Sequence, residues 1–280
     1  MIVLHLVHQC AKGMVTEMYV NTAGIVLRET PYRESSKILT VLTGGHGKLT
    51  VAAHGALRRN SKLAAVTQLL AFSEMTLYSR RDRWTMTEAR SVEQFIGLRD
   101  DVALLALGAY FAELIEAVAD EDSPNPDLLP LCLNALFALS EKIKTPDYVK
   151  PAFELRLMAA SGFEPLIGQC GVCGNHDPER AALDISGGTI KCEKCIPRYD
   201  PQSSGAYSGP EHNRTITLSR GAIRAANYII SCEAKKLFSF ALGGNALREL
   251  TEAAEGYLLA HLDRRFRTLD FYKGIHNAII

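Results

Sequence analysis

The sequence has no net charge, a single tryptophan and no long apolar run. Lys plus Arg and Asp plus Glu each number 31 among the 280 residues. Such a balance excludes a polycation of the histone type and an acidic disordered regulator. Since no stretch of about 18 apolar residues is free of charge, we expect no transmembrane helix and no membrane partner.

A secretory signal is also missing. The apolar run at residues 1–8 has no basic start, because Lys12 follows it, and no small-residue cleavage site comes after it. We therefore expect residues 1–17 to be a leader without fixed structure. Six of the seven cysteines lie beyond residue 130, and four of those form two tight pairs. This pattern differs from a secreted disulfide framework and indicates a reducing, cytoplasmic compartment.

The charge that is present is distributed unevenly. Residues 1–98 hold 12 basic and 7 acidic residues (+5), which leaves 19 basic and 24 acidic residues (−5) in 99–280. The basic residues of the first part also cluster within a few positions of one another. A basic segment on a neutral chain indicates a local binding site for a polyanion.

Short β-branched runs separated by glycine-rich or charged turns fill this basic segment. They lie at residues 23–28, 37–43, 48–52, 69–78 and 84–88. Five strands in about 70 residues, with no helical pattern between them, predict a small barrel. An oligonucleotide/oligosaccharide-binding (OB) barrel fits that count, and an SH3-like barrel fits the pattern nearly as well.

Basic and aromatic residues of the barrel suit single-stranded nucleic acid, because cations neutralise phosphates and aromatic rings stack on unpaired bases. The basic candidates are Arg28, Arg33, Lys37, Lys48, Arg58, Arg59, Lys62, Arg80, Arg81 and Arg83, and the aromatic candidates are Tyr32, Tyr78 and Trp84. Each of these arginines could instead be a solvated surface residue, and Trp84 could belong to the core.

Apolar residues recur with helical spacing on both sides of a cysteine-rich segment. Residues 101–120, 127–144 and 148–160 predict three helices before it. Residues 219–231 and 245–268 predict two more after it. A packed helical domain of this kind supplies either a scaffold or a groove for a partner.

Two C-x2-C pairs carry the most specific chemical signal. Cys170 and Cys173 are separated from Cys192 and Cys195 by eighteen residues, within the window of about 15–20 for a four-cysteine zinc site. Nearby glycines ease the turns that aim both pairs at one ion. We predict a structural zinc ion; the alternatives are a redox dithiol pair and replacement of one sulfur by His176.

Several motifs in a fixed order resemble the RecO recombination-mediator family of bacterial DNA repair. They are Gly24–Arg28 followed by Tyr32, Glu34 and Ser36; Gly55-Ala56 with Arg58-Arg59 and Ser61; Phe153–Leu157; Gly162–Leu166; Gly187-Gly188; and the two cysteine pairs. The resemblance runs from about Thr22 to Tyr272, which leaves the leader outside it.

The resemblance implies a multidomain α+β protein. An OB-type five-stranded barrel (18–97) would precede a helical domain (98–165 and 204–280) with an inserted four-cysteine zinc module (166–203). It also implies binding and annealing of single-stranded DNA. With RecR, and in many members RecF, such proteins load RecA onto DNA coated by the single-stranded-DNA-binding protein, whose tail docks on the helical domain in some members. The location that the resemblance implies is the cytoplasm, in association with the nucleoid.

Two other functions remain open on the residues alone. An RNA-binding OB protein with a zinc ribbon fits the composition, because OB barrels bind both nucleic acids. A zinc-dependent enzyme fits less well, because the sequence has no H-E-x-x-H or G-x-S-x-G motif and a four-sulfur zinc site leaves no open position. We therefore expect a protein that is not an enzyme.

Overall fold

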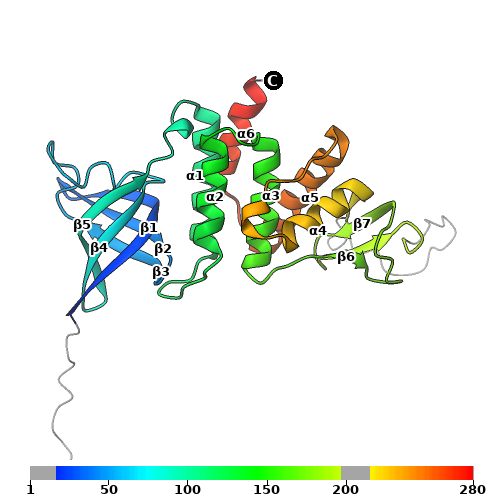
Figure 1. Cartoon of the computed structure of the whole chain (residues 1–280), viewed down its shortest axis with the longest axis horizontal. Helices are drawn as coiled ribbons and strands as arrows, with labels where there is room; N and C mark the ends of the chain where they lie inside the picture. Colours follow the sequence, from blue (N-terminus) through cyan, green and yellow to red (C-terminus); the bar gives the residue numbers. More distant parts are fainter. Residues whose placement is uncertain (1–16, 197–214, 280) are drawn as a thin grey trace, which may run out of the picture.

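The computed structural model describes residues 17–196 and 215–279 and shows an elongated molecule (Figure 1). A β-barrel forms one end, helices form the middle, and a second, smaller sheet lies at the other end. Residues 1–16 of the predicted leader lie outside the described residues. Glu17, the last residue assigned to that leader, already belongs to the first strand.

Five strands form the barrel. They are β1 (Glu17–Tyr32), β2 (Ser36–Thr43), β3 (Gly47–Ala53), β4 (Phe72–Arg80) and β5 (Arg83–Glu93). The order is β1-β2-β3-β5-β4, and pairing of β1 with β4 closes the ring. All neighbours are antiparallel except β3 and β5, which pair in parallel at Val51–Trp84 and Ala52–Thr85. The five predicted strands are therefore confirmed.

Inward-facing apolar side chains of these strands form the barrel core. Leu39 and Val41 on β2 and Met75 and Leu77 on β4 are buried, and they join a hydrophobic cluster that is separate from that of the helices. Successive side chains of a strand point to opposite faces. The residues between these apolar positions therefore lie on the outside of the barrel.

The short 3-10 helix η1 (Ile96–Leu98) connects the last strand of the barrel to a set of helices. The first three are α1 (Val102–Val118), α2 (Leu128–Ser140) and α3 (Pro146–Ala160). Asp101 caps α1 by accepting hydrogen bonds from the backbone N–H groups of Ala103 and Leu104. The helix predicted over 127–144 ends earlier than expected, at Ser140.

The second sheet contains β6 (Leu166–Cys170), β7 (Arg180–Asp184), β8 (Thr189–Cys192) and β9 (Thr215–Ser219). Its order is β6-β8-β7-β9. Residues 204–280 were expected to be the second helical part, whereas β9 pairs with β7 and so extends the cysteine-bearing module beyond residue 203. Residues 197–214 lie outside the described residues.

The remaining elements complete the helical layer. They are α4 (Arg220–Ser231), η2 (Ala234–Lys236), α5 (Gly244–Leu262) and α6 (Arg267–Ile279). The single helix predicted over 245–268 is wrong, because Asp263 adopts a left-handed conformation with φ of 44° and separates α5 from α6. Helix α6 returns to α1, where Phe266, just before it, packs edge-on against the Tyr110 ring.

Candidate nucleic-acid interface and metal centre

The predicted cations of the barrel separate into two groups. Seven are exposed on the β1–β2 turn, the β3–β4 loop and the β4–β5 hairpin: Arg33, Arg58, Arg59, Lys62, Arg80, Arg81 and Arg83. Three lie within β1, β2 and β3 and contact groups of the protein, although the Arg28 side chain is still 63% exposed: Arg28, Lys37 and Lys48. The predicted strands already carry a signal of this division, because Arg28, Lys37 and Lys48 lie within the runs 23–28, 37–43 and 48–52 and the other seven lie between predicted strands.

The second group contacts the protein itself. Arg28 forms an ion pair of 2.8 Å with Glu116 of α1, and Lys48 donates to the Glu116 carbonyl oxygen at 3.0 Å. Lys37 is buried, forms an ion pair with Glu29 and donates to the Thr67 carbonyl oxygen at 3.3 Å. The ammonium group of Lys37 is therefore engaged by oxygens of the protein, and its predicted contact with DNA stays a prediction that competes with this ion pair.

Backbone hydrogen bonds bring the exposed residues of two loops to one end of the barrel. The N–H of Leu57 donates to the Ser35 carbonyl oxygen at 3.0 Å, which ties the loop after β3 to the β1–β2 turn. This bond places Arg58 and Arg59 at the same end as Arg33. The Arg33 guanidinium also lies 5.0 Å from the centre of the Tyr32 ring, a cation–π contact.

The β4–β5 hairpin carries the other three arginines. Arg80 and Arg83 pair across the strands, and the turn consists of Arg81 and Asp82, with φ of 52° and 59°. Two left-handed residues form a type I′ turn, whose twist matches that of the strands. This short turn fixes the arginines at the tip, and the Arg80 Nε lies 3.2 Å from a Glu17 carboxylate oxygen.

The aromatic candidates also differ in position. Trp84 is half-buried: part of its ring packs against the barrel core, and it meets the His46 ring edge-on at 6.0 Å. Tyr78 lies on the outer surface beside Tyr19, a residue that sequence reasoning missed. The alternation of Tyr19 and Asn21 with apolar Val20 was the available signal.

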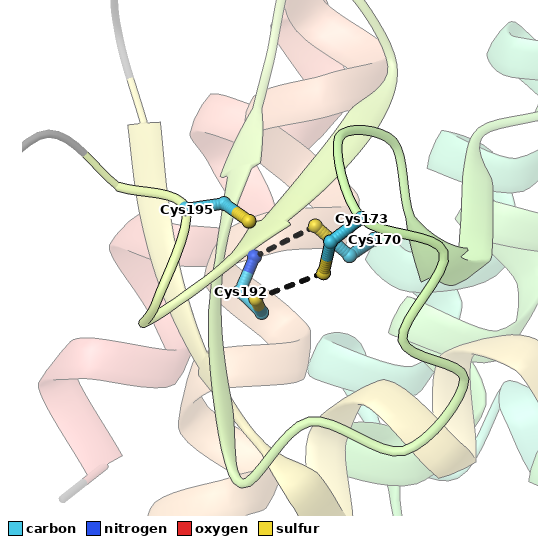
Figure 2. Close-up of side chains that lie close together, drawn as sticks. All are labelled: Cys170, Cys173, Cys192 and Cys195. Atoms are coloured by element: carbon cyan, nitrogen blue, oxygen red, sulfur yellow. Dashed lines mark hydrogen bonds between the residues drawn. The ribbon is translucent and has the colours of Figure 1, made fainter.

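The four cysteines come together at one end of the second sheet (Figure 2). Cys170 ends β6 and Cys192 ends β8, and these two strands run parallel as neighbours. Cys173 and Cys195 follow in the turns after each strand. Gly174, with φ of 72°, permits the first turn and confirms the expected role of glycine there.

The sulfur geometry fits a tetrahedral ion. The four Sγ atoms all lie within 4.8 Å of one another, and those of Cys173 and Cys192 are 3.7 Å apart. A regular tetrahedron with zinc–sulfur bonds of about 2.3 Å has sulfur–sulfur edges of about 3.8 Å. The predicted ligand set is therefore brought together, and the four thiols could hold a metal ion.

The electrostatics of the cluster differ from one thiol to another. Burial opposes ionisation of Cys170, but hydrogen bonds from the backbone N–H groups of Cys173, Cys192 and Val172 outweigh it and lower its pKa to about 6. The pKa of Cys195 is raised to about 12, chiefly by its hydrogen bond with Cys173. A bound cation would favour the thiolate form of all four.

Among the described helices, none is long and apolar enough to cross a bilayer.

Comparison with known proteins covers nearly the whole described chain. The family model "Recombination protein O N terminal" matches residues 18–95, and "Recombination protein O C terminal" matches residues 99–270. The DNA repair protein RecO of Acetivibrio thermocellus is 31% identical over 255 residues, 91% of this chain and 96% of that protein. The protein of the same name from Caldicellulosiruptor bescii is 31% identical over 256 residues, 91% and 98% of the two chains.

Proposed function

This chain belongs to the RecO family, and from that premise we propose that it is a DNA repair and recombination mediator that binds and anneals single-stranded DNA. With RecR, and where present RecF, it helps to load RecA onto DNA coated by the single-stranded-DNA-binding protein. The site of action is the nucleoid in the cytoplasm.

The observation that carries this proposal is the position of the seven exposed cations. They lie on the β1–β2 turn, the β3–β4 loop and the β4–β5 hairpin. An OB barrel binds oligonucleotides through its β1–β2 and β4–β5 loops and the face of strands β2 and β3. The closed order β1-β2-β3-β5-β4 supports assignment of the barrel to the OB type. We assign single-stranded DNA to these loops.

The proposed role needs no catalytic residue. Cations that neutralise phosphates reduce the repulsion between two complementary strands, and base pairing then supplies the free energy of annealing. The molecule acts in this proposal as a binding surface that brings strands together and holds protein partners on its helical domain. Those partners are RecR, RecF and the C-terminal tail of the single-stranded-DNA-binding protein.

For the metal centre we propose a structural zinc ion held by Cys170, Cys173, Cys192 and Cys195. A site closed by four sulfurs leaves no position for a water nucleophile. These residues would therefore join the ends of β6 and β8 and fix the outer end of the second sheet.

Charge reversal on the loops tests the DNA site. We expect Arg58→Glu/Arg59→Glu and Arg81→Glu/Arg83→Glu to weaken binding and to reduce the salt slope by about 0.7 for each lost phosphate contact. The matched control is Lys235→Glu/Arg248→Glu, which changes the charge equally at exposed residues of the helical domain. Strand-annealing rates and fluorescence anisotropy at several salt concentrations are the measurements, with circular dichroism to verify folding.

Binding by the unaltered protein that stays flat between about 50 and 200 mM salt would contradict the electrostatic mechanism. An equal loss in the control would remove the loops from the site. Competition between DNA and RNA oligonucleotides of the same sequence separates a DNA mediator from an RNA-binding protein, and tighter binding of RNA would overturn the assignment.

A further inference from the structure

Two tyrosines, the exposed Tyr19 and the half-buried Tyr78, form a pair on the outer surface of the barrel, next to the arginine hairpin. Tyr19 of β1 lies directly opposite Tyr78 of β4 in the antiparallel register. Their ring centres are 4.9 Å apart and the ring planes are inclined at 39°. Tyr19 is 71% exposed, the largest exposed fraction among the large hydrophobic side chains of the described residues.

The pair lies on the outer face of the barrel. Their neighbours in the chain, such as Leu77, point into the barrel, so the tyrosines lie on the opposite face of the same sheet. A ring left in water forgoes the free energy that burial of its apolar surface would supply. Tyr19 contributes no area to the barrel core, so its part in the fold is confined to the cross-strand contact with Tyr78, and most of its ring remains accessible to a ligand.

The surroundings of the pair supply the other groups that a polynucleotide requires. On one side the next outward-facing residues are Glu17 and Arg80, and Arg80 pairs across the hairpin with Arg83. On the other side an open groove of about 580 Å³ runs between β1, β4 and β5. Asn21 and Thr76 line it and are linked by a hydrogen bond of 2.9 Å.

The charges along this face give a direction to the bound chain. The hairpin end carries three exposed arginines, whereas the groove is lined by Glu74, Glu88 and a single arginine, Arg90, which forms an ion pair of 2.7 Å with Glu74. Phosphates are therefore attracted more strongly to the first region than to the second. A base, in contrast, is neutral and can enter a groove that has amide and hydroxyl groups.

We propose that Tyr19 and Tyr78 form a stacking platform for an unpaired nucleobase, with its phosphates on the Arg80–Arg83 hairpin and the next base at the groove. This inference rests on the proposed function and names the surface that contacts bases. Stacking on an aromatic side chain is tolerant of sequence, because every base has a π-face. Such a platform distinguishes unpaired strands from duplex DNA, whose bases are already stacked.

The test separates stacking from charge by using two ligands with the same phosphates. Oligodeoxythymidine and an abasic oligomer of equal length are titrated against the full chain, and the ratio of the two affinities is the readout. We expect Tyr19→Ala to weaken binding of oligodeoxythymidine about tenfold and to leave binding of the abasic oligomer unchanged. Arg81→Glu/Arg83→Glu should weaken binding of both ligands alike.

Phe271→Ala is the matched control, because Phe271 is an aromatic residue of α6 that is also largely exposed. Equal loss for both ligands in Tyr19→Ala would overturn stacking, and so would the same loss in Phe271→Ala or no change at all. If the unaltered protein bound neither oligomer, the proposed function itself would fail, so the two failures are distinguishable. Thermal melting of each variant confirms that the barrel is folded.

Discussion

The two β-structures of the molecule are stabilised in different ways. The barrel closes on itself and encloses its own hydrophobic cluster. The second sheet has two open edges, β6 and β9, and its inward side chains, such as Leu183 and Ile190, belong to the cluster of the helices. The barrel therefore has an independent core, whereas the second sheet depends on the helices on one face and on the cysteine cluster at its outer end.

Loss of one cysteine should have the largest effect, because it should destabilise the second sheet and leave the barrel unchanged. Cys192→Ser removes a ligand at the end of β8, and structural zinc contributes an apparent binding free energy of about 10–16 kcal/mol in small zinc domains. We expect loss of the metal and fast hydrogen exchange throughout β6–β8, with exchange in β2 and β4 unchanged. Metal content by mass spectrometry and hydrogen exchange are the measurements.

The control for this variant is Cys232→Ser, since Cys232 lies outside the cluster and contacts the Ile229 carbonyl oxygen. One tightly held zinc ion per chain in Cys192→Ser would show that the ligand set is wrong. Exchange that rises equally in the barrel would show that the two β-structures are not independent.

In the barrel, the change with the next largest expected effect is at the ion pair of Lys37 with Glu29, which is largely buried on the Lys37 side. Lys37→Met leaves Glu29 without its ammonium partner, and breaking a buried pair costs about 3–5 kcal/mol. Because the Glu29 side chain is 31% exposed, solvent compensates part of this cost, and we expect a loss of about 2 kcal/mol. Urea unfolding measures it, with Lys62→Met as the exposed control. Loss of DNA affinity without loss of stability would show instead that Lys37 contacts DNA.

A substitution at the tip of the β4–β5 hairpin should stabilise the barrel. Arg81→Asn/Asp82→Gly keeps the net charge and installs the residues preferred in a type I′ turn. Since a left-handed conformation costs an ordinary residue roughly 1–2 kcal/mol, we expect stabilisation of about 1 kcal/mol. A higher melting temperature of the barrel checks this, and a lower one would indicate that Arg81 or Asp82 makes a stabilising contact of its own.

The smallest effect is expected from the ion pair between Asp177, in the loop between β6 and β7, and Arg224 of α4. Arg224 donates two hydrogen bonds to Asp177, at 3.0 and 2.7 Å, and these lower the pKa of Asp177 below its ordinary value of 3.8. The stabilisation is present above that value and is lost as pH falls through the lowered pKa. The melting temperatures of the unaltered chain and Asp177→Asn should therefore converge below about pH 3.8. A difference that persists in strong acid would exclude this pair as its cause.

Local patterns predicted much of the fold and the metal site. The strands β2 and β3 are marked by β-branched runs on either side of a glycine turn, and the four cysteines by their spacing, which a tight turn converts directly into geometry. Features that depend on distant residues were missed. Lys37 is buried because the register of β1 and β2 places Glu29 beside it, and no spacing rule gives that register in advance.

Two predicted element boundaries were wrong for a related reason, because both depend on contacts with residues distant in the sequence. Residues 215–219 form a strand that pairs with β7, which is distant in the sequence. The five-residue run was too short to be recognised as a strand without that partner. The break at Asp263 interrupts a continuous helical pattern, and the exposed Asp263 carries no glycine or proline signal. Tertiary packing of α6 against α1 decides this position, not local preference.

The return of α6 to α1 has a consequence for synthesis on the ribosome. Thr268 donates through its backbone N–H to Glu113 at 3.3 Å, and Phe266 covers the Tyr110 ring, so the last helix completes the packing of the first. The barrel can be completed once its fifth strand has emerged, but α1 keeps an uncovered apolar face until translation reaches α6. A nascent chain that stalls before this point would expose that face, and it would be a substrate for chaperones or proteases.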